Sequence, residues 1–195
     1  MRKTARMLLI LTVAYNVVEG VIAIWSGVKA QSLALIGFGA DSYLEVGAAT
    51  LVLWRLGKMD SEEVERSEQR ATRFIGWTFV LLAVAIVTQS IWNFAYRFEA
   101  EESVFGIGLA LASVLIMPGL ALWKLNVAKQ EDIQALAIEA KETLACSYLS
   151  LTLLIGLLAN ATFGWWWLDT TTALLLTPWL IKEGLEGIRG EEHGE

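Results

Sequence analysis

The chain has 195 residues, of which 55% are hydrophobic and 18% are charged, and its mean hydropathy is +0.52. A soluble domain of this length normally carries more charge to balance its apolar core, so the composition favours a membrane protein. The net charge of −6 does not indicate a nucleic-acid partner, and the single cysteine excludes an intramolecular disulfide.

Long apolar stretches follow one another along the chain, and each is close to the ~20 residues that a membrane-spanning helix needs. The predicted spans are residues 7–28, 32–57, 70–96, 104–125, 133–160 and 164–188. We therefore expect an all-α integral membrane protein, a six-transmembrane-helix bundle that forms a single transmembrane domain over residues 1–195.

The first apolar stretch begins as a secretory signal does, because Arg2, Lys3 and Arg6 precede it. It is too long for a signal, it contains Asn16 and Glu19, and further spans follow it. We interpret it as the first membrane helix.

Local signals add detail to this arrangement. The very short connections at residues 31–32 and 162–164 predict antiparallel helical hairpins. Asp60, followed by carboxylates, is typical of a helix N-cap, so the third helix is expected to project beyond the bilayer. Pro118 and Pro178 fall within spans four and six, and each predicts a kink.

Basic residues are concentrated in alternate loops. The N-terminus, the second loop, the fourth loop with Lys124 and Lys129, and the C-terminal tail hold nearly all of them. The opposite loops hold only Lys29 and Arg97. The positive-inside rule then places both termini on the cytoplasmic side of the cell (inner) membrane, an N-in/C-in topology.

Two spans carry pairs of potential metal ligands: Asp41 and Glu45 in the second span, and Glu142 and Cys146 in the fifth. Residues four apart share a helix face, and ionisable residues in a bilayer usually mark a functional site. Two helices with two donors each could enclose one ion, in a geometry that suits zinc or cadmium. The thiolate would shift the preference toward softer ions.

Charge balance suggests how such a site could work. Fully deprotonated, Asp41, Glu45, Glu142 and Cys146 would carry more negative charge than a divalent ion neutralises. Some groups should therefore hold protons when no metal is bound, and metal entry would expel them. The alternative is structural, in which each carboxylate pairs with a neighbour and the cysteine is a small apolar residue.

The second-span motif resembles a known family. Its Ser-Leu-Ala-Leu run over residues 32–35, followed by Asp41-Ser42 and then Glu45, resembles the second helix of the cation diffusion facilitators. That helix typically reads Ser-x-Ala-Leu, then His or Asp, Ser, and an Asp four residues after the first ligand.

Other parts of the chain extend the resemblance. Residues 139–146 resemble the family's fifth-helix motif Asp-Ala-x-His-x-x-x-Asp, residues 168–169 and 181–184 resemble its sixth helix, and Asn16 fits a polar position in its first helix. The resemblance covers nearly the whole chain. We expect no C-terminal cytoplasmic metal-binding domain of the kind usual in the family, because the sequence ends at Glu195.

The resemblance implies that Asp41, Glu45, Glu142 and Cys146 occupy the four positions of the family's transport site. Members of that family export divalent metals from the cytoplasm in exchange for protons, generally as homodimers. Glu142 stands where His or Asp is usual, and Cys146 where Asp is usual, so the metal could differ from zinc or transport could be impaired.

Further polar residues could support the site. Asn16, Glu19, Glu139 and Asp169 are candidates for supporting hydrogen bonds or for a proton relay, and structural pairing between helices is the alternative for them. Lys141 could pair with Glu139 or with an acidic group on a neighbouring helix, or extend to the interface.

The sequence therefore predicts a divalent metal cation transporter, a metal/proton antiporter that exports a transition metal from the cytoplasm. Zinc is the first candidate, with cadmium or another soft divalent ion next. The expected partners are membrane lipid, metal ions, protons and a second copy of the chain. The competing hypothesis is a non-transporting relative that acts as a metal sensor or scaffold. An enzyme is disfavoured, because the only histidine is His193 in the tail and no His-Glu-x-x-His motif occurs.

Overall fold

A computed structural model describes residues 2–30, 32–58, 61–96, 104–165 and 167–189. Six helices account for nearly all of these residues, as predicted. They are α1 (Arg2–Lys29), α2 (Leu33–Arg55), α3 (Ser61–Tyr96), α4 (Val104–Glu131), α5 (Gln134–Phe163) and α6 (Leu168–Arg189).

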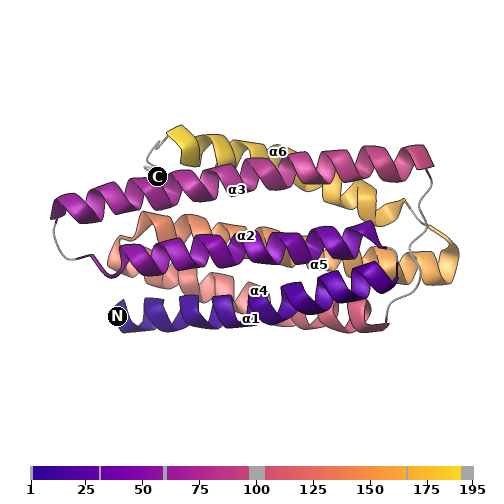
Figure 1. Cartoon of the computed structure of the whole chain (residues 1–195), viewed down its shortest axis with the longest axis horizontal. Coiled ribbons are helices and arrows are strands. Elements are labelled where there is room, and N and C mark those ends of the chain that lie inside the picture. The colour runs from indigo at the N-terminus through magenta and orange to yellow at the C-terminus, as the bar shows by residue number, and fades with distance from the viewer. Residues whose placement is uncertain (1, 31, 59–60, 97–103, 166, 190–195) are drawn as a thin grey trace.

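The helices form one elongated bundle (Figure 1). The main packing partners are α1 with α2, α3 with α6, and α4 with α5, while α2 and α5 meet in the interior. The predicted α1–α2 and α5–α6 hairpins are formed by packed neighbours. The start of α1 and the end of α6 lie at the same end of the bundle (Figure 1).

Four helices are long and apolar enough to cross a membrane by length and composition, within the described residues. They are Lys3–Lys29, Glu62–Tyr96, Val104–Glu131 and Gln134–Ala159. The other two, α2 and α6, lie in the same bundle (Figure 1). Asp41 and Glu45 lower the apolar content of α2, and Lys182 and Glu183 lower that of α6.

The predicted boundaries need small corrections. Ser32 is the N-cap of α2, where its Oγ accepts a hydrogen bond from the Leu35 amide at 3.2 Å. Residues 162–163 belong to the last turn of α5 and not to a loop, and Gly164 ends the helix with a φ of 69°. The predicted cap residue Asp60 lies outside the described residues, although α3 does begin at Ser61 and is 36 residues long.

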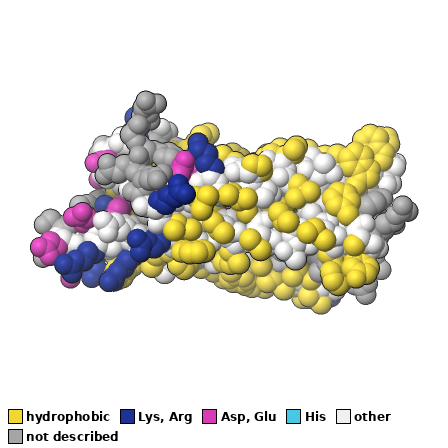
Figure 2. All heavy atoms as spheres, turned by 90° about the horizontal axis from the view of Figure 1, so that it is seen from above, with side chains coloured by type: hydrophobic (Ala, Val, Ile, Leu, Met, Phe, Trp, Pro, Cys, Tyr) yellow, Lys and Arg dark blue, Asp and Glu magenta, His cyan; other side chains and the backbone are white. Residues whose placement is uncertain are grey.

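Charged side chains gather at one end of the bundle, and hydrophobic side chains cover much of the rest of the face seen in Figure 2. This charged end is where α1 and α3 begin (Figure 1). Its exposed ion pairs, such as Arg66–Glu62 at 3.5 Å, contribute little to stability. A more buried pair joins Arg55 at the end of α2 to Glu68 of α3. Glu68 also accepts a hydrogen bond from the amide of Ala135, in the first turn of α5.

Glycines allow α3 and α6 to approach closely. A Cβ atom on Gly76 of α3 would lie 2.7 Å from the Ile188 amide nitrogen and 2.8 Å from the Gly184 carbonyl oxygen of α6. Both atoms belong to the backbone and cannot move aside without shifting a helix. Small residues at such crossings let the backbones of membrane helices pack against each other.

We predict that Gly76→Ala destabilises the protein by about 1–3 kcal/mol, because the added methyl forces α3 and α6 apart. Thermal unfolding in detergent measures the effect. Gly108→Ala is the matched control, since a Cβ there meets nothing within 4 Å. That change should be neutral or stabilising, because alanine is the better helix former. Equal stability of the two variants would contradict the close crossing.

Candidate metal site

The four residues predicted as ligands lie on α2 and α5, which contact each other in the bundle. Asp41 and Glu45 are about one turn apart on α2, and Glu142 and Cys146 are about one turn apart on α5. All four side chains are buried, with 3% or less of their surface exposed. Burial in the interior is a condition that a transport site must meet, and metal binding itself stays a prediction.

Cys146 of α5 is the proposed ligand that lies nearest to the ligand pair on α2. Its thiol lies close to the Asp41 and Glu45 carboxylates of α2. Glu142 lies beside the Thr78 hydroxyl of α3. No three acidic, cysteine or histidine side chains in the described ranges are close enough to hold one metal ion together. Side chains would therefore have to reorient before all four could coordinate one ion.

Several buried carboxylate oxygens have no hydrogen-bond partner in the part of the chain that the structure describes. They include Asp41 Oδ1, Glu45 Oε2 and Glu142 Oε2. A buried polar atom without a partner costs free energy, so most such atoms in proteins are paired. Carboxylate oxygens also coordinate metal ions. The donor chemistry at this level of the bundle thus fits a divalent cation.

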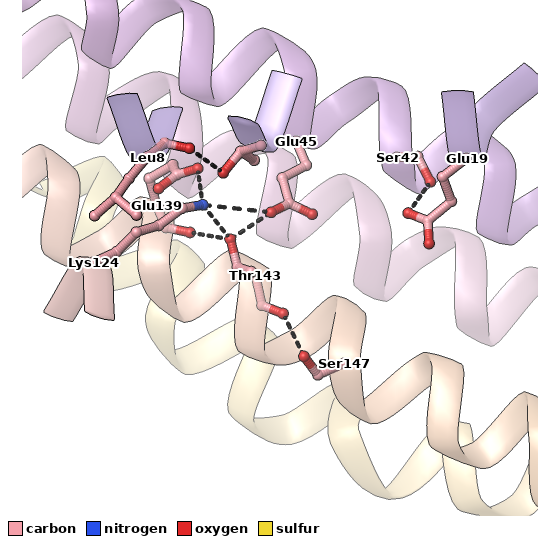
Figure 3. Close-up of polar contacts among 9 residues, drawn as sticks. Leu8, Glu19, Ser42, Glu45, Lys124, Glu139, Thr143 and Ser147 are labelled. Carbon is pink, nitrogen blue, oxygen red and sulfur yellow. Dashed lines mark hydrogen bonds and ion pairs between the residues drawn. The ribbon is translucent and has the colours of Figure 1, made fainter. Parts of the chain in front are cut away.

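Glu45 is held by a polar network that includes a buried lysine (Figure 3). The Thr143 hydroxyl of α5 donates a hydrogen bond to Glu45 Oε1. Lys124 Nζ of α4 donates to Thr143 Oγ1 and to Glu139 Oε1, each at 2.7 Å, and lies 3.8 Å from Glu45 Oε1. Lys124, Glu45 and Glu139 are all fully buried. Thr143 and Lys124 thereby engage Oε1 of Glu45, whereas its Oε2 has no hydrogen-bond partner among the described residues.

The assignment of Lys124 to the fourth loop was wrong. Helix α4 continues through this position to Glu131, and the side chain of Lys124 points into the bundle with none of its surface exposed. The sequence did hold a signal, because the apolar residues Leu125 and Val127 follow it. Apolar residues beyond a lysine indicate that the helix continues past it.

The two lysines near Glu139 have different partners. Glu139 pairs with Lys124, whereas Lys141 pairs with Glu183 of α6, with 2.6 Å between Nζ and Oε2. The expectation that Lys141 could pair with an acidic group on a neighbouring helix is confirmed. For Glu139 the structure favours pairing between helices. The side chain of Asp169, at the start of α6, lies outside the described part of the structure, so its predicted role is untested.

Glu19 forms the centre of a second buried cluster, which joins three helices. The Ser42 hydroxyl of α2 donates to Glu19 Oε2 at 3.0 Å, and the Ser113 hydroxyl of α4 donates to Glu19 Oε1. Tyr15 Oη lies 2.8 Å from Ser113 Oγ. This arrangement fits the helix–helix hydrogen-bond alternative for Glu19. Asn16, one turn earlier on α1, is buried and its amide atoms have no partner in the described ranges.

A cavity of about 80 Å³ reaches the Asp41 side chain from one direction. Its walls come from α2, α3, α5 and α6 and include Gln89, Asn93 and Thr170. Gln89 and Asn93 lie near the last turns of α3, and Thr170 lies in the first turn of α6, which is the end opposite the charged end. The cavity therefore extends from Asp41 toward the end of the bundle opposite the charged end.

An all-helical bundle with apolar membrane-length helices and a buried set of carboxylates defines a class of polytopic membrane proteins that handle cations. The comparison with protein families is specific. The Cation efflux transmembrane domain matches residues 9–190, which is nearly the whole chain. The chain therefore belongs to the cation efflux family, and the resemblance inferred from the motifs is confirmed. It is a multi-pass membrane protein of a cation-transporting, non-enzymatic family, and a metal cation is its substrate.

Proposed function

We propose that this protein is a metal/proton antiporter that exports a divalent transition metal from the cytoplasm. The observation that carries the proposal is the burial of Asp41, Glu45, Glu142 and Cys146 on two contacting helices, with a cavity that reaches Asp41. Three carboxylates and a thiol suit a metal ion, and ionisable groups in a bilayer interior usually mark an ion or proton pathway.

In this proposal the four side chains bind the metal together. Asp41, Glu45 and Glu142 supply oxygen donors, and Cys146 supplies a soft sulfur donor. Zinc is the first candidate, and cadmium is favoured next because a thiolate prefers soft ions. Protons held by these groups before metal arrives would leave on binding, which couples metal flow to proton counter-flow.

The direction of transport rests on charge distribution. Arg6 and Arg66 lie near the starts of α1 and α3, and Lys129 lies near the end of α4, so all three belong to the charged end. The positive-inside rule assigns that end to the cytoplasm. Both termini would then be cytoplasmic, in the cell (inner) membrane. The cavity that reaches Asp41 would then open on the non-cytoplasmic side of the membrane. This is expected of a state that releases metal after export. We also propose that the protein works as a homodimer, as the family resemblance implies.

Metal flux into proteoliposomes, with zinc and with cadmium as separate probes, tests the proposal. We expect an imposed pH gradient to increase uptake several-fold, and we expect each metal pulse to move protons in the opposite direction. The sole cysteine provides a second measurement, because bound metal should protect Cys146 from a thiol reagent. Flux that is independent of the pH gradient would contradict proton coupling while leaving transport intact.

A non-transporting metal sensor or scaffold is the second candidate. It is favoured by one observation, the lack of three converging ligands in the described residues. Metal that binds with protection of Cys146 but never crosses the vesicle membrane would support the sensor. A purified protein that binds neither zinc nor cadmium would contradict both candidates.

A further inference from the structure

The buried ammonium group of Lys124 is the feature that the proposed transport chemistry leaves without a role. A lysine in a membrane interior is costly, and its long side chain usually extends to the interface instead. Here it is fully buried, although α4 ends only seven residues later at Glu131. A charge retained at this depth indicates that its position serves the neighbouring groups.

Among the proposed ligands, Glu45 is the one that Lys124 contacts. The ammonium is 2.7 Å from Glu139, its main partner, and 3.8 Å from Glu45. It also donates to Thr143 Oγ1, and the Thr143 hydroxyl in turn donates to Glu45. A hydroxyl that accepts from an ammonium has its own proton directed elsewhere, so Lys124 orients the donor that holds Glu45. Figure 3 shows this chain of contacts.

Lys124 also has a defined position relative to the cavity. Lys124 and Glu139 lie toward the charged end of α4 and α5, whereas the cavity approaches Asp41 from the opposite end. A cation that reached the site from the cavity would meet the Lys124 ammonium on the far side of Glu45. Like charges repel strongly in a low-dielectric interior, so the ammonium and a metal ion compete for the same carboxylate.

We propose that Lys124 is a tethered counter-cation that engages one carboxylate oxygen of Glu45 and thereby lowers the metal affinity of the site. This inference rests on the proposed function, because it concerns the same ligands. It explains why the four ligands are neighbours without forming a closed set: one oxygen of Glu45 is already engaged by Lys124 and Thr143. Metal loading then requires Glu45 to leave this cation, and the return of Glu45 favours metal release.

The test measures binding of cadmium and of zinc to detergent-solubilised protein by calorimetry. Lys124→Gln should bind metal at least about tenfold more tightly than wild type, because the competing charge is gone. Glu139→Gln should bind less tightly than wild type, because Lys124 then has Glu45 as its remaining carboxylate partner. A lysine with a merely structural role would not produce opposite shifts in affinity.

The double variant Lys124→Gln/Glu139→Gln separates the proposal from a folding effect. It removes both charges of the buried pair, so no unpaired ion remains in the interior. The proposal expects metal binding tighter than wild type, whereas a purely structural pair predicts a return to the wild-type affinity. If Lys124→Gln fails to fold, the double variant alone still decides between these outcomes.

Lys141→Gln is the matched control. It removes another lysine that pairs with a glutamate across two helices, at 2.6 Å from Glu183, but this lysine is partly exposed and its ion pair involves none of the proposed ligands. Its metal affinity should equal that of wild type. Unchanged or weaker binding by Lys124→Gln and by the double variant, with wild type binding metal normally, would overturn this inference alone. Wild-type protein that binds no metal would overturn the proposed function, and the inference with it.

Discussion

Asp41→Asn should reduce metal flux at least about 100-fold while leaving the protein folded. Loss of a group that merely supports a ligand already costs metal sites about 10–100-fold, and loss of a ligand costs more. Asparagine keeps the size of the side chain but removes the negative charge at the inner end of the cavity. Asp41 Oδ1 has no hydrogen-bond partner among the described residues, so little internal bonding is lost.

Flux in proteoliposomes and thiol labelling of Cys146 measure this effect together. In Asp41→Asn, zinc and cadmium should no longer protect the thiol. Ser90→Ala is the matched control, because Ser90 lines the same cavity but its hydroxyl donates to the carbonyl of Ile86 in its own helix, at 2.7 Å. That variant should transport at the wild-type rate. Comparable flux in wild type and Asp41→Asn, at equal protein in the vesicles, would remove Asp41 from the metal site.

The helices, and the position of each ligand pair on its helix, could be predicted because their signals are local in the sequence. An apolar run long enough to cross a bilayer fixes a helix within a few residues, as it did for α2 and α5. A spacing of four places Asp41 with Glu45, and Glu142 with Cys146, on the same faces without any knowledge of other helices. Charges inside apolar runs then indicate an interior site.

The partners of those residues could not be predicted, because they come from helices far apart in sequence. Lys124 and Glu45 come together only when α2, α4 and α5 pack against one another, and no spacing rule in the sequence relates the two residues. The loop count treated Lys124 as a cytoplasmic charge because a lysine near a span end is normally extended toward water. The contact between Ser113 and Glu19 has the same origin, since it joins α1 to α4. Local patterns indicate which residues face inward, and packing alone decides which of them meet.

Glu68→Ala should lower the free energy of unfolding by about 3 kcal/mol, the lower end of the range for breaking a buried ion pair. Glu68 is 15% exposed and pairs with Arg55, which is 9% exposed, so its loss leaves a mostly buried guanidinium without that partner. It also removes the acceptor for the Ala135 amide, one of the unsatisfied N–H groups at the start of α5. One side chain thus connects α2, α3 and α5 at the charged end.

Thermal unfolding in detergent measures the loss, and two variants identify its cause. Glu65→Ala removes an exposed carboxylate one turn earlier on α3 and should change stability by less than about 0.5 kcal/mol. Glu68→Gln keeps an oxygen that can accept from the Ala135 amide but loses the charge, so its stability should lie between those of wild type and Glu68→Ala. Wild-type stability in Glu68→Ala would show that this contact does not hold the charged end together.

The same variant should also change access to the metal site. With the contacts of Glu68 to α2 and α5 lost at the charged end, a membrane-impermeant thiol reagent applied from that side should label Cys146 faster than in wild type. The cysteine is a clean reporter because it is the only one in the chain and is 1% exposed. Lower stability with unchanged labelling would mean that Glu68 stabilises the fold without closing the route to Asp41. Faster labelling in Glu68→Ala but not in Glu65→Ala would identify the Arg55–Glu68 pair as part of the closure on the charged side.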